Sequence, residues 1–189
     1  MTGTIRETAE TSVRVELRPG TAGGAGGAGG AGGTGKIETG VAFLDHMLTI
    51  LARYSGLDFD VSARGDLRHH VIEDVALTLG RAFKDSIPAG AARYGSRTVP
   101  MDDALVQATI DIGGRPYYQG PLPNRLYDHW MRSFSDEARS TIHIVVLRGT
   151  DKHHIIEGAF KALGFALRDA LVDTGATMST KGRVSVRVE

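Results

Sequence analysis

The pattern of apolar and polar residues predicts two strands, a helix, a strand and a second helix in the first half of the chain. Residues 11–17 alternate polar and apolar side chains, as a strand with one buried face does, and residues 36–41 follow as a second strand. Residues 43–54 and 69–83 carry apolar side chains at the spacing of a helix face, and residues 57–63 between them predict a strand.

A glycine- and alanine-rich segment separates the first two predicted strands. Residues 20–35 read GTAGGAGGAGGAGGTG and offer almost no side chains to bury, so we expect a flexible loop. Because loop length adds little closure entropy, we interpret the segment as a tolerated expansion without a function of its own. The two strands that it joins are expected to be antiparallel.

An internal repeat relates the second half of the chain to the first. Residues 64–85 align without a gap on residues 148–169, a constant shift of 84 positions (from 64 to 148). This shift superposes two copies of a His-His-x-x-Glu motif, which are His69, His70 and Glu73 in the first half and His153, His154 and Glu157 in the second. Matches this numerous at one shift indicate duplication rather than chance.

Two further features extend the repeat upstream. Asp45-His46 aligns on Asp128-His129 at a shift of 83, each pair at the start of a predicted helix, and residues 104–112 and 115–119 predict two strands. We therefore expect an α+β protein of two strand-strand-helix-strand-helix halves, residues 1–88 and 89–189. Each half is expected to be a sheet covered by helices, with the two halves packed together.

The duplicated motif has the composition of a metal site. On a helix, residues four apart share a face, so the first histidine stacks on the glutamate, and the second is expected to reach the same carboxylate. Imidazole and carboxylate together suit a transition metal. The predicted metal ligands are the two motifs and the histidine upstream of each: His46, His69, His70, Glu73, His129, His153, His154 and Glu157.

One histidine does not follow the repeat. His143 lies in a predicted strand, and its counterpart at a shift of 83 is Asp60. We interpret His143 as a structural strand residue rather than a metal ligand.

Composition limits the classes of partner and the compartment. The formal net charge is zero and there is no long basic run, so neither nucleic acid nor an anionic membrane is an expected partner. The chain has no cysteine, which removes thiolate chemistry and leaves metal binding to imidazole and carboxylate. No stretch has the apolar length of a membrane helix or the pattern of a signal peptide, and we predict a cytoplasmic protein.

The sequence leaves open how the ligands are shared. If each half owned a site, its motif and its upstream histidine would give four protein ligands and leave coordination positions open, which is typical of catalytic metals. The alternative is that ligands of one site come from different subunits.

At this point the residues resemble a known family, the imidazole glycerol-phosphate dehydratases of histidine biosynthesis. The likeness covers nearly the whole chain in the family's order, with a departure in the glycine-rich insert and a shorter lead-in before the first motif. The matching stretches are residues 6–11 (RETAET), 40–48 (GVAFLDHML), 69–74 (HHVIED), 113–117 (GGRPY), 153–162 (HHIIEGAFKA) and 179–182 (STKG).

The resemblance implies an activity, a cofactor and an assembly. Members of the family remove water from imidazole glycerol phosphate to give imidazole acetol phosphate, using two manganese ions that bind the imidazolate of the substrate. The implied fold is similar to domain 2 of ribosomal protein S5. The implied assembly is a homo-oligomer in which trimers, with active sites at their interfaces, form a 24-subunit shell.

The resemblance also implies roles for single residues. Glu10, Glu157 and Asp102 match the catalytic carboxylates, and Glu10 also faces the substrate hydroxyls. The phosphate would be held by Arg93, Arg115, Lys161, Ser179 and Lys181. The alternative for the basic residues is solvated surface charge, which is weakest for Lys161 because it lies one turn after Glu157 on the same helix face.

Two other functions would use part of the same residues. A binuclear metal hydrolase acting on a phosphate ester would release phosphate, but the chain lacks an aspartate-rich bridging motif. A non-catalytic metal-binding or shell-forming protein would leave Glu10, Arg115 and residues 179–182 without a role. A metal with no open coordination position would support the latter.

Overall fold

The protein, represented by a computed structural model, is described here over residues 3–18 and 33–176. The first half contains β1 (Gly3–Glu7), β2 (Thr11–Arg18), β3 (Ile37–Glu38), α1 (Ala42–Ser55), β4 (Asp58–Gly65) and α2 (Arg68–Ser86). The second half contains β5 (Tyr94–Met101), β6 (Ala104–Asp111), β7 (Tyr117–Gln119), α3 (Arg125–Ala138), β8 (Thr141–Arg148) and α4 (Lys152–Ala170). Most of the glycine-rich segment, together with Ser179 and Lys181, lies outside the described residues.

The two halves build four-stranded sheets of the same topology. The strand order is β1-β2-β4-β3 in one sheet and β5-β6-β8-β7 in the other. In each sheet the first three neighbours pair antiparallel and the last pair is parallel. The expected α+β fold of two repeated halves is confirmed.

Each half has one strand more than the hydrophobic pattern predicts. β1 and β5 are edge strands whose residues are largely exposed, so no alternation marks them in the sequence. The strands on either side of the glycine-rich segment run antiparallel, as expected, but they are not neighbours, because β4 lies between β2 and β3. The parallel β3–β4 pair requires a crossover, and α1 supplies it.

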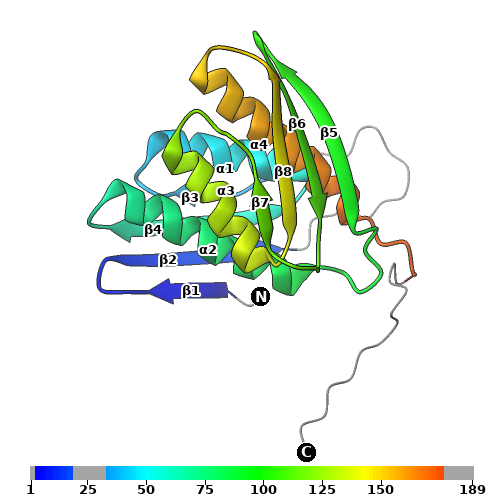
Figure 1. Cartoon of the computed structure of the whole chain (residues 1–189). Helices are drawn as coiled ribbons and strands as arrows, with labels where there is room; N and C mark the ends of the chain where they lie inside the picture. The colour runs from blue at the N-terminus through cyan, green and yellow to red at the C-terminus, as the bar shows by residue number, and fades with distance from the viewer. Residues whose placement is uncertain (1–2, 19–32, 177–189) are drawn as a thin grey trace, which may run out of the picture.

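The four helices lie between the two sheets (Figure 1). α2 covers β1 and β2, and α4 covers β5 and β6, so each sheet buries its inner face against a helix of its own half. Across the halves, α1 packs against α4 and α2 packs against α3. In the described part of the chain no helix has the length and apolar character to cross a membrane.

An aromatic cluster joins the two halves into one core. Trp130 on α3 is fully buried, stacks on Phe134 at a centroid distance of 5.3 Å and contacts Phe160 of α4 at 4.8 Å. Phe83 of α2 lies 5.7 Å from Phe134, which carries the cluster into the first half. Such pairs add about 0.5–1.5 kcal/mol each beyond their buried area. The halves therefore depend on one another for stability.

Two repeat-related glycines allow the helices of the two halves to approach closely. A Cβ at Gly80 of α2 would stand 2.7 Å from the carbonyl oxygen of Phe134 on α3. A Cβ at Gly164 of α4 would stand 2.8 Å from the Cβ of Tyr54 on α1. Both distances are below normal contact, so these crossings depend on the missing side chain. The same crossings bring together the histidines and glutamates predicted as ligands.

Candidate metal centres

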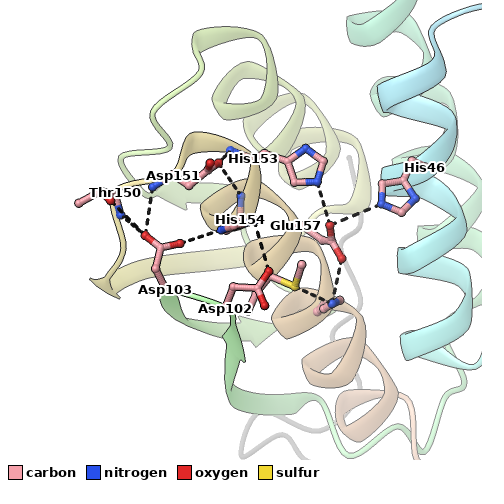
Figure 2. A network of polar contacts seen from close by, with 10 residues as sticks. His46, Asp102, Asp103, Thr150, Asp151, His153, His154 and Glu157 are labelled. Carbon is pink, nitrogen blue, oxygen red and sulfur yellow. Dashed lines mark hydrogen bonds and ion pairs between the residues drawn. The ribbon is translucent and has the colours of Figure 1, made fainter.

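The first cluster of predicted ligands joins helices from opposite halves (Figure 2). His46 projects from α1, whereas His153 and Glu157 project from α4. The Nε2 atoms of His46 and His153 lie 3.5 Å and 3.2 Å from Glu157 Oε2, and one ligand atom of each residue lies within 4.8 Å of the others. Two imidazole nitrogens and a carboxylate oxygen at this spacing fit one transition-metal ion.

The second cluster combines the motif of the first half with the upstream histidine of the second half. His129 comes from α3, and its Nε2 atom lies 3.2 Å from Oε1 of Glu73 on α2. His69, Glu73 and His129 line one cavity of about 360 Å³. Each cluster thus combines the motif helix of one half with the upstream histidine of the other half. The arrangement in which each half owns a complete site is wrong, because α1 crosses α4 and α3 crosses α2.

Local sequence explains how α4 presents its ligands. Asp151 is the N-cap, and its Oδ1 atom accepts hydrogen bonds from the amides of His153 at 2.7 Å and His154 at 3.3 Å. A capping carboxylate fixes the first turn of a helix and favours its positive end. His153 and Glu157, four residues apart, then share the face that looks toward α1.

The second histidine of each motif pairs with an aspartate rather than with the glutamate of its own motif. His154 Nδ1 lies 2.8 Å from Asp103 Oδ1, and its Nε2 lies 3.3 Å from Asp102 Oδ2 (Figure 2). His70 Nδ1 lies 2.7 Å from Asp66 Oδ1. The expectation that all three side chains of a motif reach one carboxylate is therefore wrong within a single chain, because adjacent helix residues point about 100° apart.

These contacts change the electrostatics of the second histidines. The hydrogen bond that Asp66 accepts raises the pKa of His70, and the hydrogen bond that Asp103 accepts raises the pKa of His154. The pKa of Asp103 is lowered, first by the backbone amide of Thr150 and then by the bond to His154. A carboxylate partner on Nδ1 makes Nε2 the nitrogen that could bind a metal, although in His154 this nitrogen also lies 3.3 Å from Asp102 Oδ2.

Asp66 and Asp103, the aspartates that pair with Nδ1 of the second histidines, were not predicted as site residues. Asp66 precedes His70 by four positions and was detectable as an ordinary local carboxylate–histidine pair. Asp103 is 51 residues from His154 and has no such sequence signal. Its place is set by the β5–β6 turn, which reaches the start of α4 and also accepts from the amides of Thr150 and Asp151.

The two glutamates of the motifs occupy different surroundings. Glu157 is buried, with a side chain 9% exposed, and its Oε1 lies 2.9 Å from Lys161 Nζ. Burial alone would raise the pKa of Glu157, but Lys161 and His46 outweigh burial and lower it. The side chain of Glu73 is 40% exposed, and the repeat shift places Leu77 where the second half has Lys161. The clusters match in ligands but differ in charge.

The predicted acid–base residues Glu10 and Asp102 lie in equivalent turns. Glu10 follows β1, and Asp102 follows β5, each in the hairpin turn before the next strand of its sheet. Glu10 Oε2 lies 3.6 Å from His70 Nδ1, just as Asp102 approaches His154. A carboxylate therefore stands beside the second histidine in both halves, which the repeat alignment alone did not reveal.

The described phosphate-binding candidates are not gathered at one point of the chain. Arg93 has a left-handed backbone with φ of 77° and pairs with Asp111, its Nε lying 2.6 Å from Oδ1. The carbonyl oxygen of Arg115 accepts a hydrogen bond from the Thr141 hydroxyl at 3.0 Å. Of the remaining candidates, Lys161 is held at the first cluster and Ser179 and Lys181 fall outside the described residues.

His143 occupies the place that the sequence predicts. It lies on β8, and its ring is 5.5 Å from the ring of Tyr117 on β7. Ring contacts between neighbouring strands stabilise sheets, so a structural role for His143 stays the prediction.

Curated relatives and solved structures match this chain over nearly its whole length. A protein of Pyrobaculum calidifontis named imidazoleglycerol-phosphate dehydratase is 45% identical, covering 94% of this chain and 96% of the relative, and one of Salinibacter ruber with the same name is 42% identical, covering 95% and 93%. The Pyrococcus furiosus crystal structure of that enzyme, solved in complex with (S)-C348, superposes with a TM-score of 0.81 at 38% identity, covering 95% of this chain and 99% of the other. These similarities define an enzyme of the hydro-lyase class.

A second solved structure and a family model identify the family within this class of enzymes. The Staphylococcus aureus imidazoleglycerol-phosphate dehydratase superposes with a TM-score of 0.73 at 31% identity, covering 92% of this chain and all of the other. Residues 39–167 match the family model described as imidazoleglycerol-phosphate dehydratase, and this range contains both histidine–glutamate clusters. The chain belongs to the imidazoleglycerol-phosphate dehydratase family.

Proposed function

We propose that the protein converts imidazole glycerol phosphate into imidazole acetol phosphate and water in histidine biosynthesis, using two manganese ions. The observation that carries the proposal is the pair of clusters, His46–His153–Glu157 and His69–Glu73–His129, in a chain that belongs to the dehydratase family. Two equivalent clusters suit a substrate ring with two nitrogens. As a biosynthetic enzyme it is expected in the cytoplasm.

The donor set fits manganese. Each cluster offers imidazole nitrogen and carboxylate oxygen, a mixture that divalent first-row metals accept. Three protein ligands from one chain leave coordination positions open, as catalytic sites do. In the first cluster Glu157 Oε2 lies near both imidazoles while Oε1 pairs with Lys161, so Oε2 would be the oxygen that holds an ion.

The second histidines support shared sites between subunits. His70 and His154 stand outside the clusters of their own chain, each held by an aspartate through Nδ1. We propose that each supplies a further ligand to a cluster of a neighbouring subunit. The sites would then lie at the interfaces of a homotrimer, and trimers would assemble into a 24-subunit shell. Oligomerisation and metal binding would accordingly depend on one another.

The chemistry requires two proton transfers that the chain's carboxylates can perform. When bound, the metal pair would stabilise the imidazolate form of the substrate ring, whose electrons expel hydroxide from the carbon beside the ring. Glu10 and Asp102 stand in hairpin turns beside the second histidines, where one carboxyl group can donate a proton to the leaving hydroxide. The other can remove the proton from the next carbon, which gives an enol that becomes the ketone product.

The basic residues would hold the phosphate and thereby orient the glycerol side chain of the substrate. Arg93, Arg115, Lys161, Ser179 and Lys181 supply guanidinium, ammonium and hydroxyl donors that suit a phosphate dianion. Because the described ones are dispersed in one chain, we propose that a complete cradle combines residues of neighbouring subunits.

The test is turnover of imidazole glycerol phosphate by protein stripped of metal and then resupplied with manganese. We expect manganese to restore formation of imidazole acetol phosphate, and His70→Ala and His154→Ala to abolish it. His143→Ala is the matched control, because it removes an imidazole that contacts Tyr117 rather than a cluster.

The same experiment separates the rival functions. Release of inorganic phosphate in place of the ketone would indicate a binuclear hydrolase. Manganese binding without any turnover would favour a metal-binding or shell-forming protein. Retained dehydration in His70→Ala and His154→Ala would refute the proposed site even if the substrate assignment stands.

A further inference from the structure

A buried carboxylate next to the metal-ligand helix has no role in the chemistry described above. Asp74 directly follows Glu73 on α2, and its side chain points toward the β1–β2 hairpin. Its Oδ1 atom accepts a hydrogen bond from Arg6 Nε at 2.7 Å, and its Oδ2 atom accepts one from the hydroxyl of the buried Thr11. A buried charge is costly unless it is paired in this way.

The carboxylate of Asp74 sets the direction of the hydrogen bonds that the Thr11 hydroxyl makes in the turn. A carboxylate only accepts, so the Thr11 hydroxyl must donate to Asp74. The Thr11 oxygen is then free to accept from the Thr8 hydroxyl, 3.2 Å away. The Thr8 oxygen in turn accepts from the backbone amides of Glu10 at 3.1 Å and Thr11 at 2.9 Å. Aligned chains of this kind strengthen each bond in the series.

The series of hydrogen bonds that begins at Asp74 ends at the backbone amide of Glu10. Its amide is held by Thr8, and its carbonyl oxygen accepts from the Asp66 amide at 3.1 Å, in the segment that leads into α2. Its carboxylate lies 3.6 Å from His70. The backbone of Glu10 is therefore fixed on both sides to the segment and helix that carry the first His-His-x-x-Glu motif.

We propose that Asp74 is the positioning residue for Glu10, an inference that rests on the proposed dehydratase function. Asp74 acts through Thr11 and Thr8 to hold the carboxylate of Glu10 at a fixed position relative to the candidate metal ligands of α2, the helix that carries Asp74. The second half has no counterpart, because the repeat shift places Gly158 at the position of Asp74. Among the described residues, the turn that carries Asp102 therefore lacks an equivalent anchor. Of the two turn carboxylates, Glu10 is the one whose turn is hydrogen-bonded to the side chain of a helix residue that follows a candidate metal ligand.

The test uses variants that change the hydrogen bonds but not the volume. Asp74→Asn offers one acceptor atom instead of two, so it cannot accept from both Arg6 and Thr11. Thr11→Val removes the hydroxyl, and Thr11→Ser restores it. The matched control is Asp169→Asn, which removes the Arg97–Asp169 ion pair between a strand and a helix of the second half.

Turnover of imidazole glycerol phosphate with manganese is measured for each variant alone and in a Glu10→Gln background. In the wild-type background we expect Asp74→Asn and Thr11→Val to lower kcat by about 10-fold to 100-fold, as displaced catalytic groups do, with near-normal activity in Thr11→Ser and Asp169→Asn. In the Glu10→Gln background both substitutions should change kcat by less than about threefold, because the group that they position is already lost.

A general loss of structure would give a different result. If Asp74 acted only on folding, or on the neighbouring ligand Glu73, its effect would persist undiminished in Glu10→Gln, and that outcome would overturn the proposal. Manganese bound per chain, counted by electron paramagnetic resonance, should be the same in Asp74→Asn and in the wild type. Absence of turnover in the wild type, or full activity in Glu10→Gln, would instead refute the proposed function or the role of Glu10.

Discussion

The close crossing of α2 and α3 leads to a prediction about both stability and metal binding. In Gly80→Ala the new Cβ would stand 2.7 Å from the Phe134 carbonyl oxygen. Carbon–oxygen contacts in proteins are about 3.3 Å or longer, so the helices must separate by about 0.6 Å. Overpacking costs about 1–3 kcal/mol, and the upper part of that range, about 2–3 kcal/mol, applies here because the nearest atom belongs to the backbone and cannot rotate away. The better helix propensity of alanine offsets about 1 kcal/mol. We expect a net loss of about 1–2 kcal/mol.

The separation of the helices should also weaken one metal cluster. α2 carries Glu73 and α3 carries His129, so their 3.2 Å contact must lengthen, whereas the cluster built on α1 and α4 is left intact. The assays are urea unfolding of the metal-free variant at fixed protein concentration and a manganese titration. Gly158→Ala is the control, because its Cβ would meet side-chain atoms rather than backbone, Val106 Cγ2 at 3.1 Å and the Cβ atoms of Met101 and Val106 at 3.6 Å. A Gly80→Ala protein as stable as the wild type would refute the reasoning.

Three further predictions follow from the site. Lys161→Leu removes the ammonium 2.9 Å from Glu157, so a manganese titration should show about tenfold tighter binding at that cluster; unchanged or weaker binding would contradict it. Asp103→Asn should lower the melting temperature of the metal-free protein. The pKa of Asp103 is lowered in the folded state and the pKa of its partner His154 is raised, so the difference from the wild type should be largest at about pH 5–6. The difference should shrink as the pH falls below about 4, the unfolded value of Asp103, and its ion-pair part should also shrink as the pH rises through the raised pKa of His154; a difference that grows below about pH 4 would refute this. Tyr118→Phe deletes a buried hydroxyl that donates a hydrogen bond to Asp128 on α3 at 2.7 Å. We expect the free energy of unfolding to fall by about 1–2 kcal/mol, and no change would contradict this prediction.

Sequence reasoning identified the chemistry through duplication. A polar trio kept at one shift in both halves, His69, His70 and Glu73 and their counterparts, marks positions that a drifting repeat would otherwise lose. The periodicity of apolar residues placed these trios on helices, and the structure has them at the starts of α2 and α4. The two edge strands were missed, because exposed strands pair through their backbones and leave no hydrophobic alternation to detect.

The sequence by itself determined the α+β repeat, the family and the identity of the candidate ligands, because side-chain type and local spacing are one-dimensional properties. Only the tertiary structure decided which ligands meet. His46 joins Glu157 rather than Glu73 because α1 packs on α4 across the halves, a choice made by shape complementarity at crossings such as those of the two glycines. Within the second half, the packing of α4 on β5 and β6 brought His154 beside Asp103, a neighbour 51 residues away in the sequence, and contacts of that separation are set by the fold as a whole.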